Sequence, residues 1–136
     1  MRQYKIDEAI QYSLALRIDK SSDVRFVSET IVKLWQEVVR RLEPIIGDQG
    51  TEVVFTRSLH LTNKEFPWIA VVDNKSTSST QIQLFLQSFE GRDSILLSKA
   101  SYKLLATFSQ LLASLIGETL TQRLLTPVLI ADKVEN

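Results

Sequence analysis

The side chains best suited to chemistry in this chain lie between residues 57 and 64. Arg57, His60 and Lys64 recur at intervals of three and four, so one face of a helix would carry a guanidinium, the only imidazole and an ammonium group. Ser58 cannot act as a nucleophile with His60 as its base, because residues two apart on a helix point about 160° away from each other. We therefore predict that these three cations contact a partner or ligand; the plainer interpretation is a solvated helix face.

Three further residues are candidate contacts. Arg40 and Arg41 lie just before Pro44, at the expected end of a helix, where cations stabilise the exposed carbonyl groups. They could instead join Arg57 in a small basic patch that grips a carboxylate or phosphate. Trp68 follows a Phe-Pro pair, which suits either a packed corner at a helix end or an anchor for a partner protein.

The common catalytic and cofactor sites need residues that this sequence lacks. With no cysteine and one histidine, it cannot form disulfides, thiol-based active sites or Cys- and His-rich metal sites. The four glycines do not form either Gly-rich phosphate-binding motif, and the acidic residues are too scattered for a divalent-metal enzyme. We therefore predict no cofactor, no metal and no enzymatic activity; an enzyme that uses His60 alone is the remaining catalytic hypothesis.

Charge and hydropathy disfavour two classes of partner. The 16 Lys and Arg residues balance 16 Asp and Glu residues, which leaves no basic stripe for nucleic acid. The longest uncharged stretches, 76–89 and 104–117, have 14 residues each, whereas a membrane-spanning helix needs about 20. The first residues also lack the apolar core of a leader peptide. We expect a soluble, cytoplasmic protein that binds neither nucleic acid nor membrane.

The spacing of apolar residues predicts three helices in the first half of the chain. Residues 6–18 carry an apolar residue at every fourth position, and this N-terminal helix packs on the same chain or is exchanged with a second subunit. A long helix is predicted over 24–42, with a break near Glu43 because Pro44 cannot continue the hydrogen-bond ladder. The next helix is predicted over about 50–65.

The second half is less uniform. Residues 68–72 favour a packed connection over a strand, and the polar stretch 73–80 predicts a flexible loop. Residues 81–89 favour a helix over the rival strand. The broad apolar band of residues 95–116 predicts the central helix of the core, and Gly117 after it marks either a bend or a close approach of another helix.

Together these elements predict a single all-α domain over residues 1–136, a compact bundle of five to six helices. Because the apolar band of the central helix is wider than one bundle needs, we predict a homodimer whose interface includes Leu105, Leu112 and Leu120. The leading function is a small non-enzymatic regulatory or adaptor module that acts through contacts with a second copy and with an unidentified protein.

The alternative function is the binding of an apolar or amphipathic small molecule between the helices. Five aromatic residues could line such a pocket, and His60 or Arg57 could orient a polar group of the ligand. The five are Trp35, Phe55, Phe85, Phe89 and Phe108. A core, a pocket and a dimer interface share the same apolar periodicity, so the sequence leaves both functions open.

Overall fold

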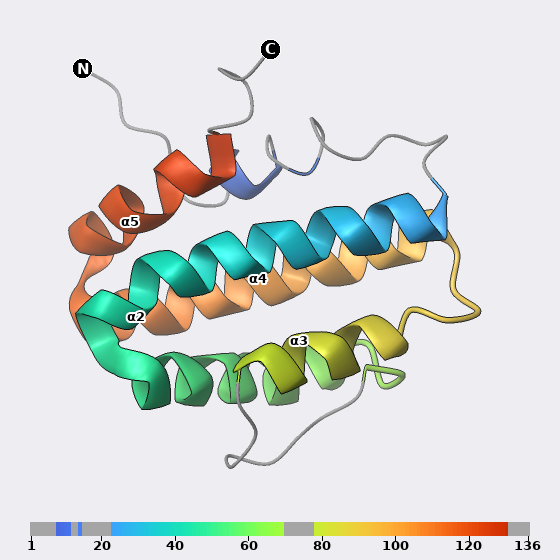
Figure 1. The fold of residues 1–136 in the computed structure, drawn as a ribbon, viewed down its shortest axis with the longest axis horizontal. Helices are drawn as coiled ribbons and strands as arrows, with labels where there is room; N and C mark the ends of the chain where they lie inside the picture. Colours follow the sequence, from blue (N-terminus) through green and yellow to red (C-terminus); the bar gives the residue numbers. More distant parts are fainter. Residues whose placement is uncertain (1–7, 12–13, 15–22, 70–77, 131–136) are drawn as a thin grey trace.

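The computed structural model of the protein describes residues 8–11, 14, 23–69 and 78–130, and this part of the chain is all-α, as predicted (Figure 1). The described residues between its helices form turns, bends or irregular backbone, and no strand occurs among the described residues. Four helices carry labels: α2 (Val24–Asn63), α3 (Ser78–Gln87), α4 (Ser94–Ile116) and α5 (Glu118–Ile130).

Helix α2 consists of two arms that lie side by side, a first arm (24–46) and a second arm (48–63). The first arm begins where the Asp23 Oδ1 atom accepts a hydrogen bond of 2.8 Å from the Phe26 backbone N–H. Gly47 separates the arms with φ 82° and ψ 167°, a backbone conformation that essentially only glycine adopts. The chain reverses direction there, so α2 forms a helical hairpin (Figure 1).

The predicted break lies four residues later than Glu43, because the helix continues through Pro44 and the first arm ends at Gly47. Pro44 lies in the last turn of the first arm, where few hydrogen bonds of the ladder remain to be lost. The second arm is then fixed to the turn by the Thr51 hydroxyl, which donates to the Gly47 carbonyl oxygen at 2.9 Å.

Three aromatic rings join the two arms to α4. Trp35 of the first arm stacks on Phe55 of the second arm with ring centroids 4.7 Å apart. Phe108 of α4 meets both rings edge-on, at 5.0 Å from Trp35 and 6.2 Å from Phe55. All three side chains are fully buried. The centre of the bundle is therefore a cluster of rings with one contribution from each of three helical segments.

Helix α3 packs on the second arm of α2. The Gln81 side chain is buried and its Nε2 atom donates to the Thr56 hydroxyl, while Phe85 and Phe89 pack edge to face in the core at 4.9 Å. The helix predicted over 81–89 is confirmed in place of the strand. The loop predicted over 73–80 extends too far, because residues 78–80 belong to α3. Residues 73–77 lie outside the described part.

Helix α4 matches the long helix predicted over 95–116, and it packs mainly against α2. Its first turn is capped by Asp93, whose Oδ1 accepts from the Leu96 backbone N–H at 2.7 Å. Gly117, with φ 93°, ends α4, and no atom lies within 4 Å of the position that a Cβ would take there. Gly117 therefore marks the predicted bend, after which α5 folds back over the bundle (Figure 1).

The described residues of the predicted N-terminal helix 6–18 pack on their own chain. Residues 8–11 and 14 are helical, and Ala9, Ile10 and Leu14 are buried within the single chain. An exchange of this helix with a second subunit stays a prediction, and the rest of 6–18 lies outside the described part. Of the predicted connection 68–72, Trp68 and Ile69 form a turn and a bend rather than a strand, and the others are not described.

Removing a ring from the aromatic cluster will destabilise the fold strongly. We expect Phe108→Ala to lower the free energy of unfolding by about 3–5 kcal/mol, because a fully buried ring is replaced by a cavity between three helices. Ile95→Ala on the same helix is the matched control, since that side chain is 58% exposed and should change the value by less than about 0.5 kcal/mol. Urea denaturation measures both, and equal effects would contradict the ring packing.

The turn between the two arms of α2 should depend on glycine at position 47. Gly47→Ala should cost about 1–3 kcal/mol, because an alanine is strained at φ 82° although space for its methyl group is free. Gln49→Ala, at an exposed helical position two residues later, should leave the free energy of unfolding nearly unchanged or raise it slightly. A neutral Gly47→Ala in thermal and urea unfolding would mean that the turn does not need glycine.

Candidate functional site

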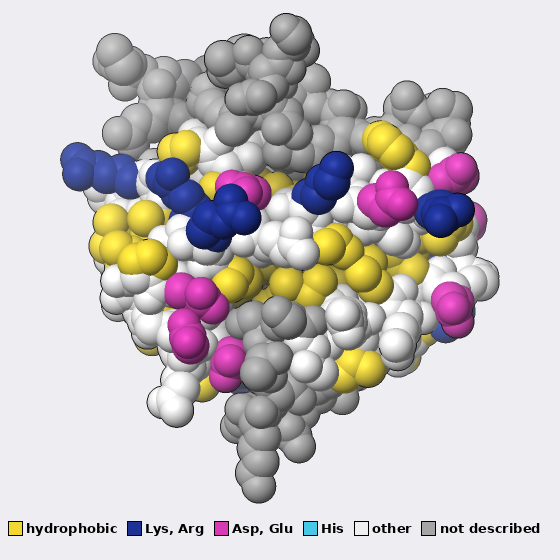
Figure 2. All heavy atoms as spheres, in the orientation of Figure 1, with side chains coloured by type: hydrophobic (Ala, Val, Ile, Leu, Met, Phe, Trp, Pro, Cys, Tyr) yellow, Lys and Arg dark blue, Asp and Glu magenta, His cyan; other side chains and the backbone are white. Residues whose placement is uncertain are grey.

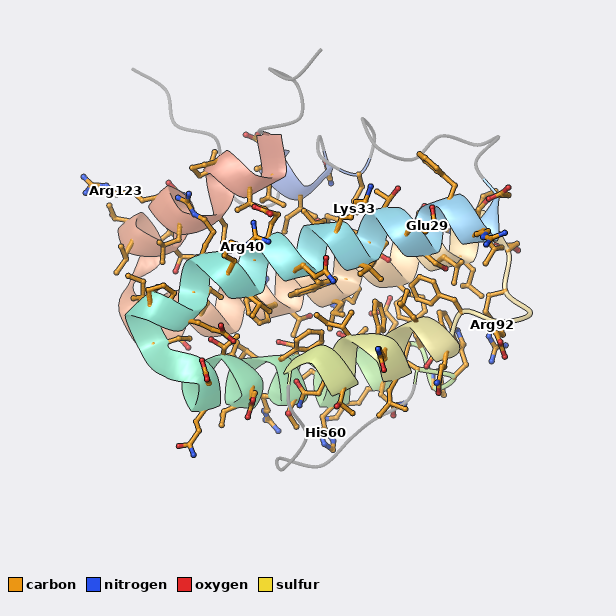
Figure 3. All side chains as sticks on the ribbon, viewed as in Figure 1. Glu29, Lys33, Arg40, His60, Arg92 and Arg123 are labelled. Atoms are coloured by element: carbon orange, nitrogen blue, oxygen red, sulfur yellow. The ribbon has the colours of Figure 1, made fainter. Side chains whose placement is uncertain are left out.

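The three cations predicted to contact a partner lie together on the outside of the second arm of α2. Arg57, His60 and Lys64 are all exposed, and none of their side chains forms a hydrogen bond or ion pair with a residue that the structure describes. His60 points away from the bundle (Figure 3). Ser58 is buried, and its hydroxyl donates to the Val54 carbonyl oxygen at 2.7 Å, so it is unavailable to His60. Their contact with a partner stays a prediction.

The other predicted contacts do not join this group. Arg40 lies on the first arm, well separated from His60 in Figure 3, and its Nη1 atom is 2.7 Å from the Glu37 Oε1 atom. Arg41 is exposed on the same arm. The basic patch with Arg57 stays a prediction.

Trp68 forms a packed corner. Its ring is half-buried and meets Phe66 edge to face at 6.0 Å. The Arg92 guanidinium, from the turn after α3, lies 4.9 Å from the centre of the Trp68 ring and makes a cation–π contact with it. Sequence reasoning did not single out Arg92, because no local pattern links it to a residue 24 positions earlier. Trp68 therefore has partners within its own chain.

Two of the three residues predicted at a dimer interface are inside the core, so that prediction is wrong for Leu105 and Leu112. Leu105 is 2% exposed and Leu112 is 0% exposed. The physical reason is that α2 and α5 both cover α4, which buries its wide apolar band within one chain. Leu120, in the first turn of α5, is 37% exposed and remains available to a partner.

The five aromatic side chains predicted to line a pocket are fully buried in the core. They pack on one another in two groups, the cluster of three rings and the pair on α3 and the turn after it. The five side chains are Trp35, Phe55, Phe85, Phe89 and Phe108.

An exposed apolar surface lies at the end of the bundle where α2 reverses and α4 gives way to α5. We call it the turn face. Ile45, Leu115 and Leu120 are three of the six large apolar side chains that are exposed in the described part of the chain. Each lies within three residues of Gly47 or Gly117, and the two turns occupy the same end of the bundle (Figure 1). Half-buried apolar side chains continue this surface: Ile46, Ile116 and Leu124.

Charges of opposite sign border the turn face on opposite sides. Figure 2 shows hydrophobic side chains at this end, at the left, with Lys and Arg above them and Asp and Glu below. Glu43, Asp48 and Glu52 lie within five residues of Gly47 in the sequence, and Arg123 of α5 lies at this end of the bundle (Figure 3). None of these four makes an ion pair with any residue in the described ranges. Glu118 adds a further carboxylate at the first turn of α5.

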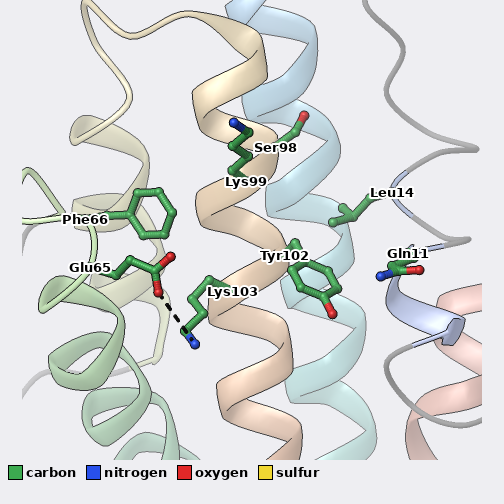
Figure 4. A pocket seen from close by; sticks show the side chains of 8 residues that line it. All are labelled: Gln11, Leu14, Glu65, Phe66, Ser98, Lys99, Tyr102 and Lys103. Carbon is green, nitrogen blue, oxygen red and sulfur yellow. Dashed lines mark ion pairs between the residues drawn. The ribbon is translucent and has the colours of Figure 1, made fainter.

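A second surface feature is an open groove of about 590 Å³ along the outward side of α4, which we call the α4 groove. Ser98, Lys99, Tyr102 and Lys103 form its floor (Figure 4). Glu65 and Phe66, beyond the end of α2, line one side, and the N-terminal residues Gln11 and Leu14 line the other (Figure 4). The Lys103 Nζ atom lies 3.6 Å from the Glu65 Oε1 atom. Sequence reasoning missed this groove because its walls come from three distant segments.

Comparison with known proteins gives no relative for this chain: no protein-family model matches it, and neither a curated protein nor a solved structure shows a significant match. Within the described residues, His, Asp and Glu side chains form no group of three that could hold a metal ion. In the same part of the chain, no helix is both long and apolar enough to cross a membrane.

Proposed function

We propose that this protein is a small non-enzymatic interaction module that works as a homodimer and as a regulatory or adaptor protein for a further partner. The observation that carries the proposal is the turn face, where exposed apolar residues lie between a basic and an acidic border. An apolar surface with a charged rim is typical of protein contacts.

The order of charges on the turn face favours a second copy of the same chain. In a two-fold symmetric dimer the same patch meets itself in reversed orientation. A rotation through the apolar centre would bring the basic side of one copy against the acidic side of the other, at two equivalent places. The zero net charge of the chain adds no long-range repulsion between the copies.

The area that a stable interface needs also indicates that the charged border of the turn face belongs to the dimer interface. A standard interface buries about 800 Å² on each partner, which is more than three exposed apolar side chains supply. The charged border must therefore lie within the contact area, where it contributes mainly to orientation and association rate. Burial of Ile45, Leu115 and Leu120 supplies most of the affinity.

The further partner would use a different surface. Arg57, His60 and Lys64 form a separate exposed group on the second arm, and they suit a partner protein with an acidic segment. No catalytic role is assigned to His60, because the Ser58 hydroxyl is engaged with the Val54 carbonyl oxygen and the imidazole points away from the bundle. The cytoplasmic location expected from the sequence stays a prediction.

A charge in the centre of the turn face will separate the dimer. We expect the wild-type chain to have twice its 15.5-kDa mass in light scattering at high concentration and to dissociate on dilution. Leu115→Asp should be monomeric over the same range, because burial of an unpaired carboxylate opposes association. Ile95→Asp is the matched control on the other end of α4, since Ile95 is similarly exposed at 58% against 66% for Leu115.

The border charges give a further check on the same dimer. Arg123→Glu should weaken association by about three- to tenfold at low ionic strength and less at high salt, because it places like charges opposite each other. A wild-type chain that stays monomeric at every concentration would refute the proposal. So would a dimer that Leu115→Asp and Ile95→Asp weaken equally.

A further inference from the structure

We propose that the α4 groove binds an amphipathic small molecule with one carboxylate head group and a short aliphatic or aromatic body. This inference concerns a different surface from the turn face and does not depend on dimerisation. It rests on the positions of the charges in the groove, on the groove's apolar walls and on its size (Figure 4).

The position of the head group follows from a difference between the two lysines on the floor of the groove. Lys99 and Lys103 are four residues apart on α4 and therefore lie on the same face of the helix. Glu65 neutralises Lys103 at 3.6 Å and repels a second anion near it. Lys99 forms no ion pair with a described residue, so the groove has one uncompensated cation at that end. A single carboxylate matches it.

A neutral donor accompanies this cation. Ser98 and Lys99 line the same end of the groove in Figure 4, and the Ser98 hydroxyl makes no hydrogen bond within the described residues. A carboxylate between them would accept from both groups, and a charge-assisted hydrogen bond is stronger than a neutral one. The Tyr102 hydroxyl is likewise unpaired in the part of the chain that the structure describes.

The body of the ligand would lie between apolar walls. Phe66 is half-buried on one side of the floor, Leu14 is buried on the other, and the half-buried ring of Tyr102 lies between them (Figure 4). An alkyl chain or a ring that covers these groups removes apolar surface from water on both molecules. The lysine stems add further apolar contact, because their methylene groups lie along the floor.

The size of the groove favours a small molecule over a helical segment of a partner. Its floor spans Ser98 to Lys103, about 7.5 Å along the axis of α4 at 1.5 Å per residue. A docked helix needs anchors from position i to i+7, about 10.5 Å apart. The volume of about 590 Å³ is within the usual range for small-molecule sites.

Isothermal titration of the full chain with decanoate, below the concentration at which it forms micelles, tests the inference. We expect saturable binding of one decanoate per chain and no such binding of decyltrimethylammonium, which has an alkyl chain of similar length and the opposite charge. Lys99→Gln should weaken decanoate binding about five- to tenfold through loss of the charged contact. Lys103→Gln, on the same helix face, is the matched control and should weaken it less than about twofold.

The outcomes distinguish this site from a general affinity for surfactants and from the turn face. Absence of saturable decanoate binding, equal binding of the cation, or equal effects of Lys99→Gln and Lys103→Gln would each overturn the inference. Chemical shifts in an NMR titration should change at Phe66, Lys99 and Tyr102, and changes confined to the turn face would also overturn it. Leu115→Asp should bind decanoate like the wild type, whether or not the chain dimerises.

Discussion

The contact of Trp35, Phe55 and Phe108 determines the arrangement of the other helices. Gly47 reverses the direction of α2, but a reversal alone does not set which residues of the two arms face each other. The stacked pair at 4.7 Å sets that register, and Phe108 then places α4 against both arms. The Trp35 Nε1 atom is buried there without a hydrogen-bond partner, which costs desolvation free energy. The burial of the three rings must contribute more stability than this cost.

This packing decides which surfaces are left for function. Because the apolar band of α4 packs against α2 and α5, residues such as Leu112 are buried in the core and cannot contact a partner. What remains exposed is set by the places where helices end. The glycines at 47 and 117 both bring the chain around at the same end of the bundle, which leaves the apolar side chains beside them only partly covered.

The sequence predicts the parts of this structure that depend on local pattern. The helical periodicity of the apolar residues predicts the helices. The N-cap at Asp23 and the bend at Gly117 also depend on the residue type at a single position, an aspartate before a helix and a glycine after one. The sequence does not reveal what covers an apolar face, and for this reason Leu105 was assigned to an interface although it lies in the core. Pairs such as Arg92 with Trp68 depend on tertiary packing and leave no local pattern.

The two proposed surfaces differ in how their charges are compensated, and this difference indicates what each can bind. The turn face has Lys and Arg side chains on one side of its apolar centre and Asp and Glu side chains on the other (Figure 2). A molecule with the same pattern in reversed orientation satisfies both signs at once, and a second copy has that pattern by symmetry. In the α4 groove Glu65 already compensates Lys103, so only the charge of Lys99 remains. A surface with one charge left over is not self-complementary in this way and favours a ligand of the opposite sign, which is why the groove is assigned to an anion and the turn face to the protein itself.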